Sequence, residues 1–310
     1  MKPAASRMET GCMASEVRES LDAYLAFQIA EVQRSMPLIS AADQEAVHSA
    51  RLALRRLRSG ISCFGIFLPP APPEARHGIR WLATSLGEAR DLFVLAQRVK
   101  LWLDAPVPWR SAEILRTAVE GLVERSNSIA RHVAGDLRAS RAITDFAGLP
   151  SHGTGPNGPT DGQAIACLHR QWEVMQQRIA EAEKSRSGSA RNELLHDARK
   201  DVKRLRYALE AVAGALGPGS LLILQPAVAL QRVLGEHHDA VASLAWMDTL
   251  AVDRGIDASD LDQLRHMEAR RLEEAEREYS RTLLETPVPA PGAVLSSDGA
   301  VPAVRLQDQS

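Results

Sequence analysis

A twelve-residue basic segment occurs twice in this sequence, and the duplication constrains the fold more than any other feature. The segment reads Val-His-Ser-Ala-Arg-Leu-Ala-Leu-Arg-Arg-Leu-Arg at residues 47–58 and Leu-His-Asp-Ala-Arg-Lys-Asp-Val-Lys-Arg-Leu-Arg at residues 195–206. A shorter segment, Leu-Gly-Glu-x-x-Asp, occupies residues 86–91 and 234–239, and both pairs are separated by 148 residues. Two segments at one common offset indicate a duplicated pair of helices.

The basic side chains of each copy form a stripe if the segment is helical. At about 100° per residue, the four cationic or histidine positions of a copy lie within about 80° of one another. Apolar residues collect on the adjoining face, as expected for a helix that packs on a core. The stripes consist of His48, Arg51, Arg55 and Arg58 in the first copy and of His196, Arg199, Lys203 and Arg206 in the second.

These stripes indicate a bound polyanion. Solvated helix faces usually mix charges of opposite sign, whereas like charges three and four residues apart repel each other. A repulsive pattern that occurs twice is best explained by an anion that neutralises it. The planar guanidinium of Arg donates two parallel hydrogen bonds to phosphate oxygens, and the ammonium of Lys attracts them as a point charge. The stripes therefore suit a repeating phosphate chain. The net charge of −2 does not oppose this, because acidic residues concentrate in 253–285.

The composition and the periodicity predict an all-α protein. Hydrophobic residues make up 45% of the 310 residues but aromatic residues only 4%, and strand-like alternation is nearly absent. Helical patterns cover residues 15–34, 40–68, 74–103, 109–146, 162–185, 190–216, 219–250 and 257–285. We therefore predict two four-helix bundles related by an internal pseudo-two-fold repeat. The predicted parts are a disordered tail (1–14), a first bundle (15–147), a Gly/Pro linker (148–162), a second bundle (163–285) and a disordered tail (286–310).

Histidines and aspartates accompany both stripes. His48 and His196 begin the stripes, where imidazole could donate a hydrogen bond or add charge. Asp91 and Asp239 are expected to orient neighbouring guanidiniums. The neighbours His237 and His238 point about 100° apart on a helix, so we predict no metal site there.

The sequence favours a cytoplasmic protein that does not contact a membrane. The three cysteines, Cys12, Cys63 and Cys167, are far apart and show no metal-binding or disulfide spacing. No apolar run approaches the about 18 residues that span a bilayer, and no signal-peptide pattern is present. No nucleophile elbow, P-loop or Rossmann fingerprint occurs, so we expect neither catalysis nor a cofactor.

The repeated segments resemble the CHAD domain family over about residues 15–285. The resemblance rests on His-x-x-Arg-x-x-x-Arg/Lys-Arg-x-Arg in both copies, each followed by Leu-Gly-Glu-x-x-Asp. It implies two four-helix bundles, binding of inorganic polyphosphate in a central cationic groove, and targeting to polyphosphate granules. Phe93 departs from the family pattern, which often has a second Asp there. The sequence also contains no fused triphosphate-tunnel domain, the usual source of enzymatic activity.

Together the stripes and the resemblance predict the residues that contact polyphosphate. They are His48, Arg51, Arg55, Arg56, Arg58, Arg90, His196, Arg199, Lys200, Lys203, Arg204, Arg206 and His238. The alternative is a metal-dependent phosphohydrolase acting on polyphosphate or nucleotides, which would need further His and Asp ligands. Nucleic acid is expected only as a weaker electrostatic competitor, because Tyr207 is the only aromatic residue in either basic motif.

Overall fold

The computed structural model describes residues 5–104, 109–148, 159–185, 188–253 and 256–295, and it confirms the all-α prediction. None of these residues lies in a strand. The N-terminal half contains α1 (Ala5–Ser40), α2 (Gln44–Phe64), the 3₁₀ turn η1 (Gly65–Phe67), α3 (Pro73–Leu103), α4 (Ala112–Gly135) and α5 (Leu137–Ala147). The C-terminal half contains α6 (Asp161–Lys184), α7 (Ser189–Leu216), the turn η3 (Pro218–Ser220), α8 (Leu221–Asp253), α9 (Ala258–Glu285) and α10 (Pro291–Val294).

Helix α1 differs from its prediction at both ends. It begins at Ala5, so residues 5–14 are helical rather than a disordered tail. It continues through Pro37 to Ser40, because Ile39 is fully buried and its burial offsets the hydrogen bond that proline cannot donate. Helix α2 begins later than the predicted residue 40, because Asp43 caps it by accepting hydrogen bonds from the backbone N–H groups of Glu45 and Ala46.

The chain after α9 is also folded where a disordered tail was predicted. The carbonyl oxygen of Val288 accepts a hydrogen bond of 2.9 Å from Trp172 Nε1 of α6, and Val288 itself is buried. Pro291 is buried at the start of α10. Residues 286–295 are therefore anchored, and residues 296–310 of the predicted tail lie outside the described residues. Most of the predicted linker, residues 149–158, does as well.

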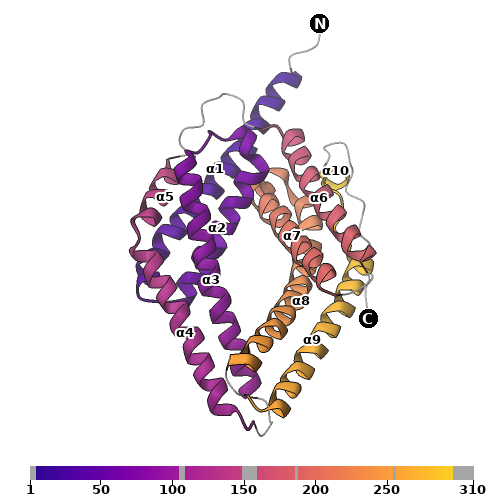
Figure 1. Ribbon diagram of the computed structural model, residues 1–310. Helices are drawn as coiled ribbons and strands as arrows, with labels where there is room; N and C mark the ends of the chain where they lie inside the picture. Colours follow the sequence, from indigo (N-terminus) through magenta and orange to yellow (C-terminus); the bar gives the residue numbers. More distant parts are fainter. Residues whose placement is uncertain (1–4, 105–108, 149–158, 186–187, 254–255, 296–310) are drawn as a thin grey trace, which may run out of the picture.

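Helices α2 and α7 pack against each other in the middle of the molecule (Figure 1). Helix α1 packs on both, and α6 packs on α7. The main hydrophobic core draws buried residues from both halves of the chain, including Leu54, Leu57, Leu205 and Leu209. The core therefore does not separate by sequence halves, and the division into two four-helix bundles stays a prediction.

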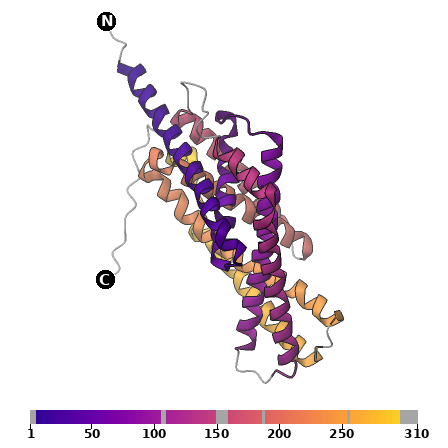
Figure 2. The same cartoon turned by 90° about the vertical axis from the view of Figure 1, so that its left-hand side faces the viewer.

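Two long hairpins, α3–α4 and α8–α9, extend away from the α2–α7 pair and meet again at their far ends (Figures 1 and 2). A second apolar cluster forms there from residues of all four helices. The fully buried Glu268 of α9 accepts hydrogen bonds from Arg98 at 2.9 and 2.6 Å and from Trp102 Nε1 at 2.8 Å. This buried, fully paired carboxylate fixes the two hairpins relative to each other.

Candidate anion-binding site

The contact between α2 and α7 brings the two predicted stripes together. Arg51 and Arg55 come from α2, and Arg199 and Lys203 come from α7. We call these four residues the central cluster. Burial and the positive charges of Arg55 and Arg199 together lower the pKa of Arg51 to about 10, against the opposing charge of Asp91. Residues 148 positions apart thus act on one another directly.

Lys203 is the most strongly perturbed member of the central cluster. Its side chain is buried, with 9% of its surface exposed. Burial lowers its pKa to about 6, and the neighbouring charges of Arg199 and Arg55 act in the same direction. Within the described residues Lys203 makes no ion pair and no side-chain hydrogen bond. The charge of Asp239 only partly offsets this burial, so the ammonium is unfavourable where it lies, and a bound anion would relieve it.

Two carboxylates lie beside the four cations but do not neutralise them. Asp91 Oδ1 accepts a hydrogen bond of 2.7 Å from Arg51 Nη2, and the Asp91 side chain is 69% exposed. Burial raises the pKa of Asp239, and the positive charge of Arg199 opposes this increase. Asp239 forms no ion pair among the described residues. The buried Nε atoms of Arg51 and Arg199 have no hydrogen-bond partner. Donors for an anion therefore remain.

The glycine of each Leu-Gly-Glu-x-x-Asp segment lies against an arginine of the central cluster. A Cβ added at Gly87 would lie 3.6 Å from Arg51 Nε, and one added at Gly235 would lie 3.9 Å from Arg199 Nε. Both distances are ordinary van der Waals contacts, and they place Gly87 of α3 next to α2 and Gly235 of α8 next to α7. The group that lies against each glycine is a guanidinium rather than an apolar side chain, so the glycines help to place the site.

Histidines flank the central cluster at matching positions of the two copies. The rings of His196 and His238 are 4.2 Å apart between centroids, at an interplanar angle of 31°. Burial and the charge of Arg199 lower the pKa of His238 to about 3. In the first copy, burial and the charge of Arg90, which occupies the position of His238, lower the pKa of His48. These imidazoles are therefore neutral near pH 7.

His237 points away from the cluster. It is buried on a different face of α8, where its Nε2 is 3.7 Å from Glu276 of α9. His237 and His238 therefore face different helices. Among the described residues, no group of three or more His, Cys, Asp or Glu side chains is placed to hold a metal ion.

Comparison with known proteins identifies the family of the chain. The sequence model of the CHAD domain matches residues 23–248, which is well over half of the chain. The chain belongs to the CHAD domain family. The two uncharacterized proteins MT2285 and Rv2226, each from a strain of Mycobacterium tuberculosis, are both 29% identical to it over 214 residues. This match covers 64% of the chain but only 39% of each relative, so the chain spans about two fifths of their length.

Two solved structures share the fold of this CHAD domain. The crystal structure of the CHAD domain from the plant Ricinus communis superposes with a TM-score of 0.71 at 23% identity, covering 88% of this chain and 93% of that one. PptA from Streptomyces chartreusis superposes with a TM-score of 0.71 at 19% identity, covering 86% and 99%. At these identities the likeness establishes the fold alone.

Two other arginines of this CHAD domain's predicted site share a carboxylate. Arg56 Nε lies 3.2 Å from one oxygen of Glu210, and Arg206 Nε donates to the other at 2.8 Å. The hydroxyl of Tyr24 also donates to Glu210, at 3.4 Å. These arginines therefore already have a partner within the fold. The sequence does contain a signal for this, since Glu210 follows Arg206 by four residues, the spacing of an ion pair on one helix face.

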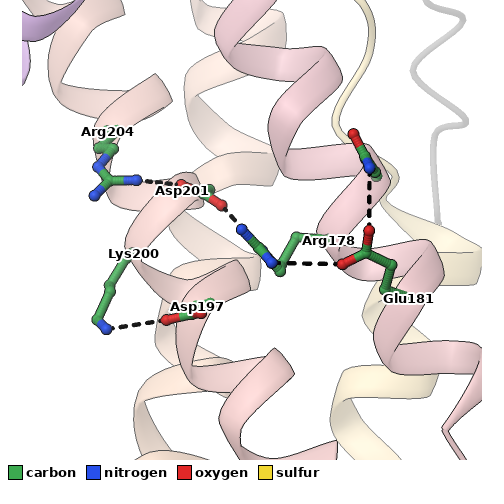
Figure 3. A network of polar contacts seen from close by, with 7 residues as sticks. Arg178, Glu181, Asp197, Lys200, Asp201 and Arg204 are labelled. Atoms are coloured by element: carbon green, nitrogen blue, oxygen red, sulfur yellow. Dashed lines mark hydrogen bonds and ion pairs between the residues drawn. The ribbon is translucent and has the colours of Figure 1, made fainter.

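Lys200 and Arg204 are paired on the outer face of α7 (Figure 3). Lys200 Nζ donates to Asp197 at 3.0 Å, and Arg204 Nη1 donates to Asp201 at 2.6 Å. Asp201 is buried, and Arg178 of α6 lies 3.8 Å from its second oxygen. Both acids belong to the second basic segment itself and have no counterpart in the first, so the two stripes differ in charge on this face.

Arg58, the last residue of the first stripe, is exposed on α2 and forms no ion pair among the described residues. Burial lowers the pKa of Arg58 most. The positive charges of Arg80 and Arg204 lower it as well, and each contributes more than the charge of Arg55 on the same helix. Arg80 belongs to α3 and was not among the predicted site residues. It has no counterpart at the 148-residue offset, where Val228 stands, so the repeat pattern could not identify it.

Proposed function

We propose that this CHAD domain binds inorganic polyphosphate at the central cluster and does not hydrolyse it. The family is known in connection with polyphosphate. One observation carries the proposal: positive charge without a partner is concentrated in the central cluster. Among the described residues, Arg55, Arg199 and Lys203 form no ion pair with a carboxylate. Most other arginines on the described helices have such a partner, so the contrast points to an external anion.

The chemistry of the central cluster fits a chain of phosphates. Guanidiniums bind phosphate oxygens through paired N–H groups, and a lysine adds a point charge that tolerates different geometries. Partial burial strengthens each of these interactions relative to bulk water. We further propose that the two copies are related by a pseudo-two-fold repeat, so that one phosphate chain contacts both α2 and α7.

A metal-dependent phosphohydrolase is the rival from another class. It requires carboxylates and imidazoles that converge on a metal ion, whereas the acidic groups nearest the cluster are the separate Asp91 and Asp239. Release of phosphate from polyphosphate or nucleotides in the presence of Mg²⁺ or Mn²⁺ would establish the rival. We propose that the protein releases none and that nucleic acid competes only weakly.

The proposed location is the cytoplasm, at polyphosphate granules. Within the described residues, none of the helices combines the length and apolar character that crossing a bilayer requires. A fluorescent fusion should colocalise with granules in cells that accumulate polyphosphate. It should become diffuse when the cationic side chains of the central cluster are replaced.

Titration with long-chain polyphosphate, and with single-stranded DNA of equal total charge, tests the proposed function directly. Binding of polyphosphate should weaken steeply as salt rises, because each neutralised phosphate releases condensed counterions. DNA should bind more weakly at every salt concentration. An affinity for polyphosphate that stays constant from low to high salt would contradict the proposal, and so would a preference for DNA.

A further inference from the structure

A cavity of about 340 Å³ lies where the two long hairpins meet, beside the second apolar cluster (Figure 1). Helices α3, α4 and α8 form its walls, and their apolar surface comes from Leu92, Leu95, Leu122, Trp246 and Leu250. Small-molecule sites in proteins have volumes of about 300–1,000 Å³. The cavity is therefore large enough for a small organic molecule, which would contact both halves of the chain.

Gly121 of α4 leaves part of this space open. A Cβ added at Gly121 would meet no other atom within 4 Å, so close packing does not require a glycine there. The residue lies inside a regular helix, where glycine is less favourable than alanine. Gly121 also lines the cavity. A larger side chain at this position would occupy the space that the glycine leaves free.

Arg125 places a positive charge at the edge of the cavity, one helical turn after Gly121. Its side chain is 69% exposed, and its Nη2 lies 3.7 Å from the carboxylate of Glu88 on α3, which is longer than a hydrogen bond. An exposed ion pair of this kind contributes little free energy. The guanidinium therefore has N–H groups available for an anion that enters the cavity.

The two α4 residues that define this site are not repeated in the second copy. At the 148-residue offset, Ala269 stands in place of Gly121 and Glu273 in place of Arg125. A carboxylate in place of the guanidinium would repel an anion. The site is therefore separate from the duplicated basic stripes and lies on different helix faces from the central cluster.

We propose that this cavity binds a small amphipathic carboxylic acid, with its apolar body against Leu122 and Trp246 and its carboxylate on Arg125. A planar carboxylate matches the two parallel N–H groups of a guanidinium. One guanidinium balances the single charge of a carboxylate, whereas a phosphate monoester carries a charge of about −1.5 to −2 at pH 7. A ligand in this position joins the α3–α4 hairpin to α8. The inference does not depend on polyphosphate binding.

Calorimetric titration of the full chain with octanoate tests this inference. Octanol, which has no charge, and octyl phosphate, which has more charge, are titrated in parallel. Gly121→Leu fills the cavity, and Arg125→Gln removes the charge at its edge. Arg131→Gln is the matched control, because Arg131 is exposed on the same helix, pairs with Glu124 at 2.8 Å and does not line the cavity.

Gly121→Leu should abolish binding of octanoate and raise the Tm, because leucine replaces a glycine inside a helix and fills open space. Arg125→Gln should weaken binding about two- to fivefold, the size of one exposed ion pair, and Arg131→Gln should not change it. Only the binding that Gly121→Leu removes is assigned to the cavity, and there octanol and octyl phosphate should bind more weakly than octanoate.

Four results would overturn the inference. They are a wild-type protein that does not bind octanoate, octanoate binding that survives Gly121→Leu, equal effects of Arg125→Gln and Arg131→Gln, and tighter binding of octanol or octyl phosphate in the cavity. A Gly121→Leu variant with a lower Tm would show that the space is not open, and this result would also contradict the proposed site.

Discussion

Lys203 shows most clearly that the fold buries a cationic side chain among other positive charges. Its ammonium faces Arg51 and Arg55 of α2, Arg199 of its own helix and the carboxyl of Asp239 on α8, together with His238. The sequence identified Lys203 as a member of the second stripe. It could not show that Lys203 is buried, because burial depends on how α2 and α8 pack on α7.

Replacement of this lysine should stabilise the free protein. The pKa of Lys203 falls from its usual value of 10.5 in the unfolded chain to about 6 in the fold. Between these values the unfolded chain binds more protons, so the free energy of unfolding contributed by this group rises with pH. The unfavourable contribution is largest at and below about pH 6. Lys203→Met should therefore raise the free energy of unfolding at pH 6 by about 1–4 kcal/mol, and by less at pH 9.

Urea denaturation at the two pH values measures this gain, and a polyphosphate titration of the same variant provides the second readout. Affinity should fall while stability rises, because the buried charge that destabilises the fold is also the charge that we propose to bind the ligand. A variant that is less stable than wild type at pH 6 would show that Lys203 has a structural partner.

At the scale of single elements, the helices could be predicted well and their ends only in part. Periodicity located α2, α3, α7 and α9 because each buries a continuous apolar stripe. It failed at α1, where burial of Ile39 carries the helix past Pro37. It failed again at 286–295, where Val288 and Trp172 form a contact between segments 116 residues apart. Such long-range contacts leave no periodic trace in the sequence.

The contact between the hairpin ends was also invisible in the sequence. Glu268 lies within an acidic helix and looks like a solvated residue, yet it is fully buried between α3 and α9. Glu268→Ala should lower the free energy of unfolding by about 3–5 kcal/mol, because it leaves Arg98 as a buried cation without a counter-charge and Trp102 Nε1 without an acceptor.

Urea denaturation measures the loss, with Glu274→Ala as the matched control. Glu274 is exposed on the same helix, and its replacement should change stability by no more than about 0.5 kcal/mol. Similar values for the two variants would show that the hairpin ends contribute little to the fold.

At the scale of the whole molecule, the contact between α2 and α7 assembles a cationic cluster that neither copy of the basic segment contains alone. The central cluster takes two cations from α2 and two from α7, and the core beneath it also draws on both halves. Sequence reasoning could predict which residues form each stripe. It could not predict that Arg56 of α2 would share Glu210 with Arg206, because that depends on the packing of separate helices.

One measurement tests most directly whether the two copies act as a single site. Arg51→Gln with Arg55→Gln, and separately Arg199→Gln with Lys203→Gln, are titrated with long-chain polyphosphate, with Arg76→Gln as the control and circular dichroism to verify the fold. If one phosphate chain is held by both helices, as we propose, each double variant should lose most of the affinity while remaining helical. If each double variant instead keeps about half the binding capacity at unchanged affinity, the copies are independent sites and the account is wrong.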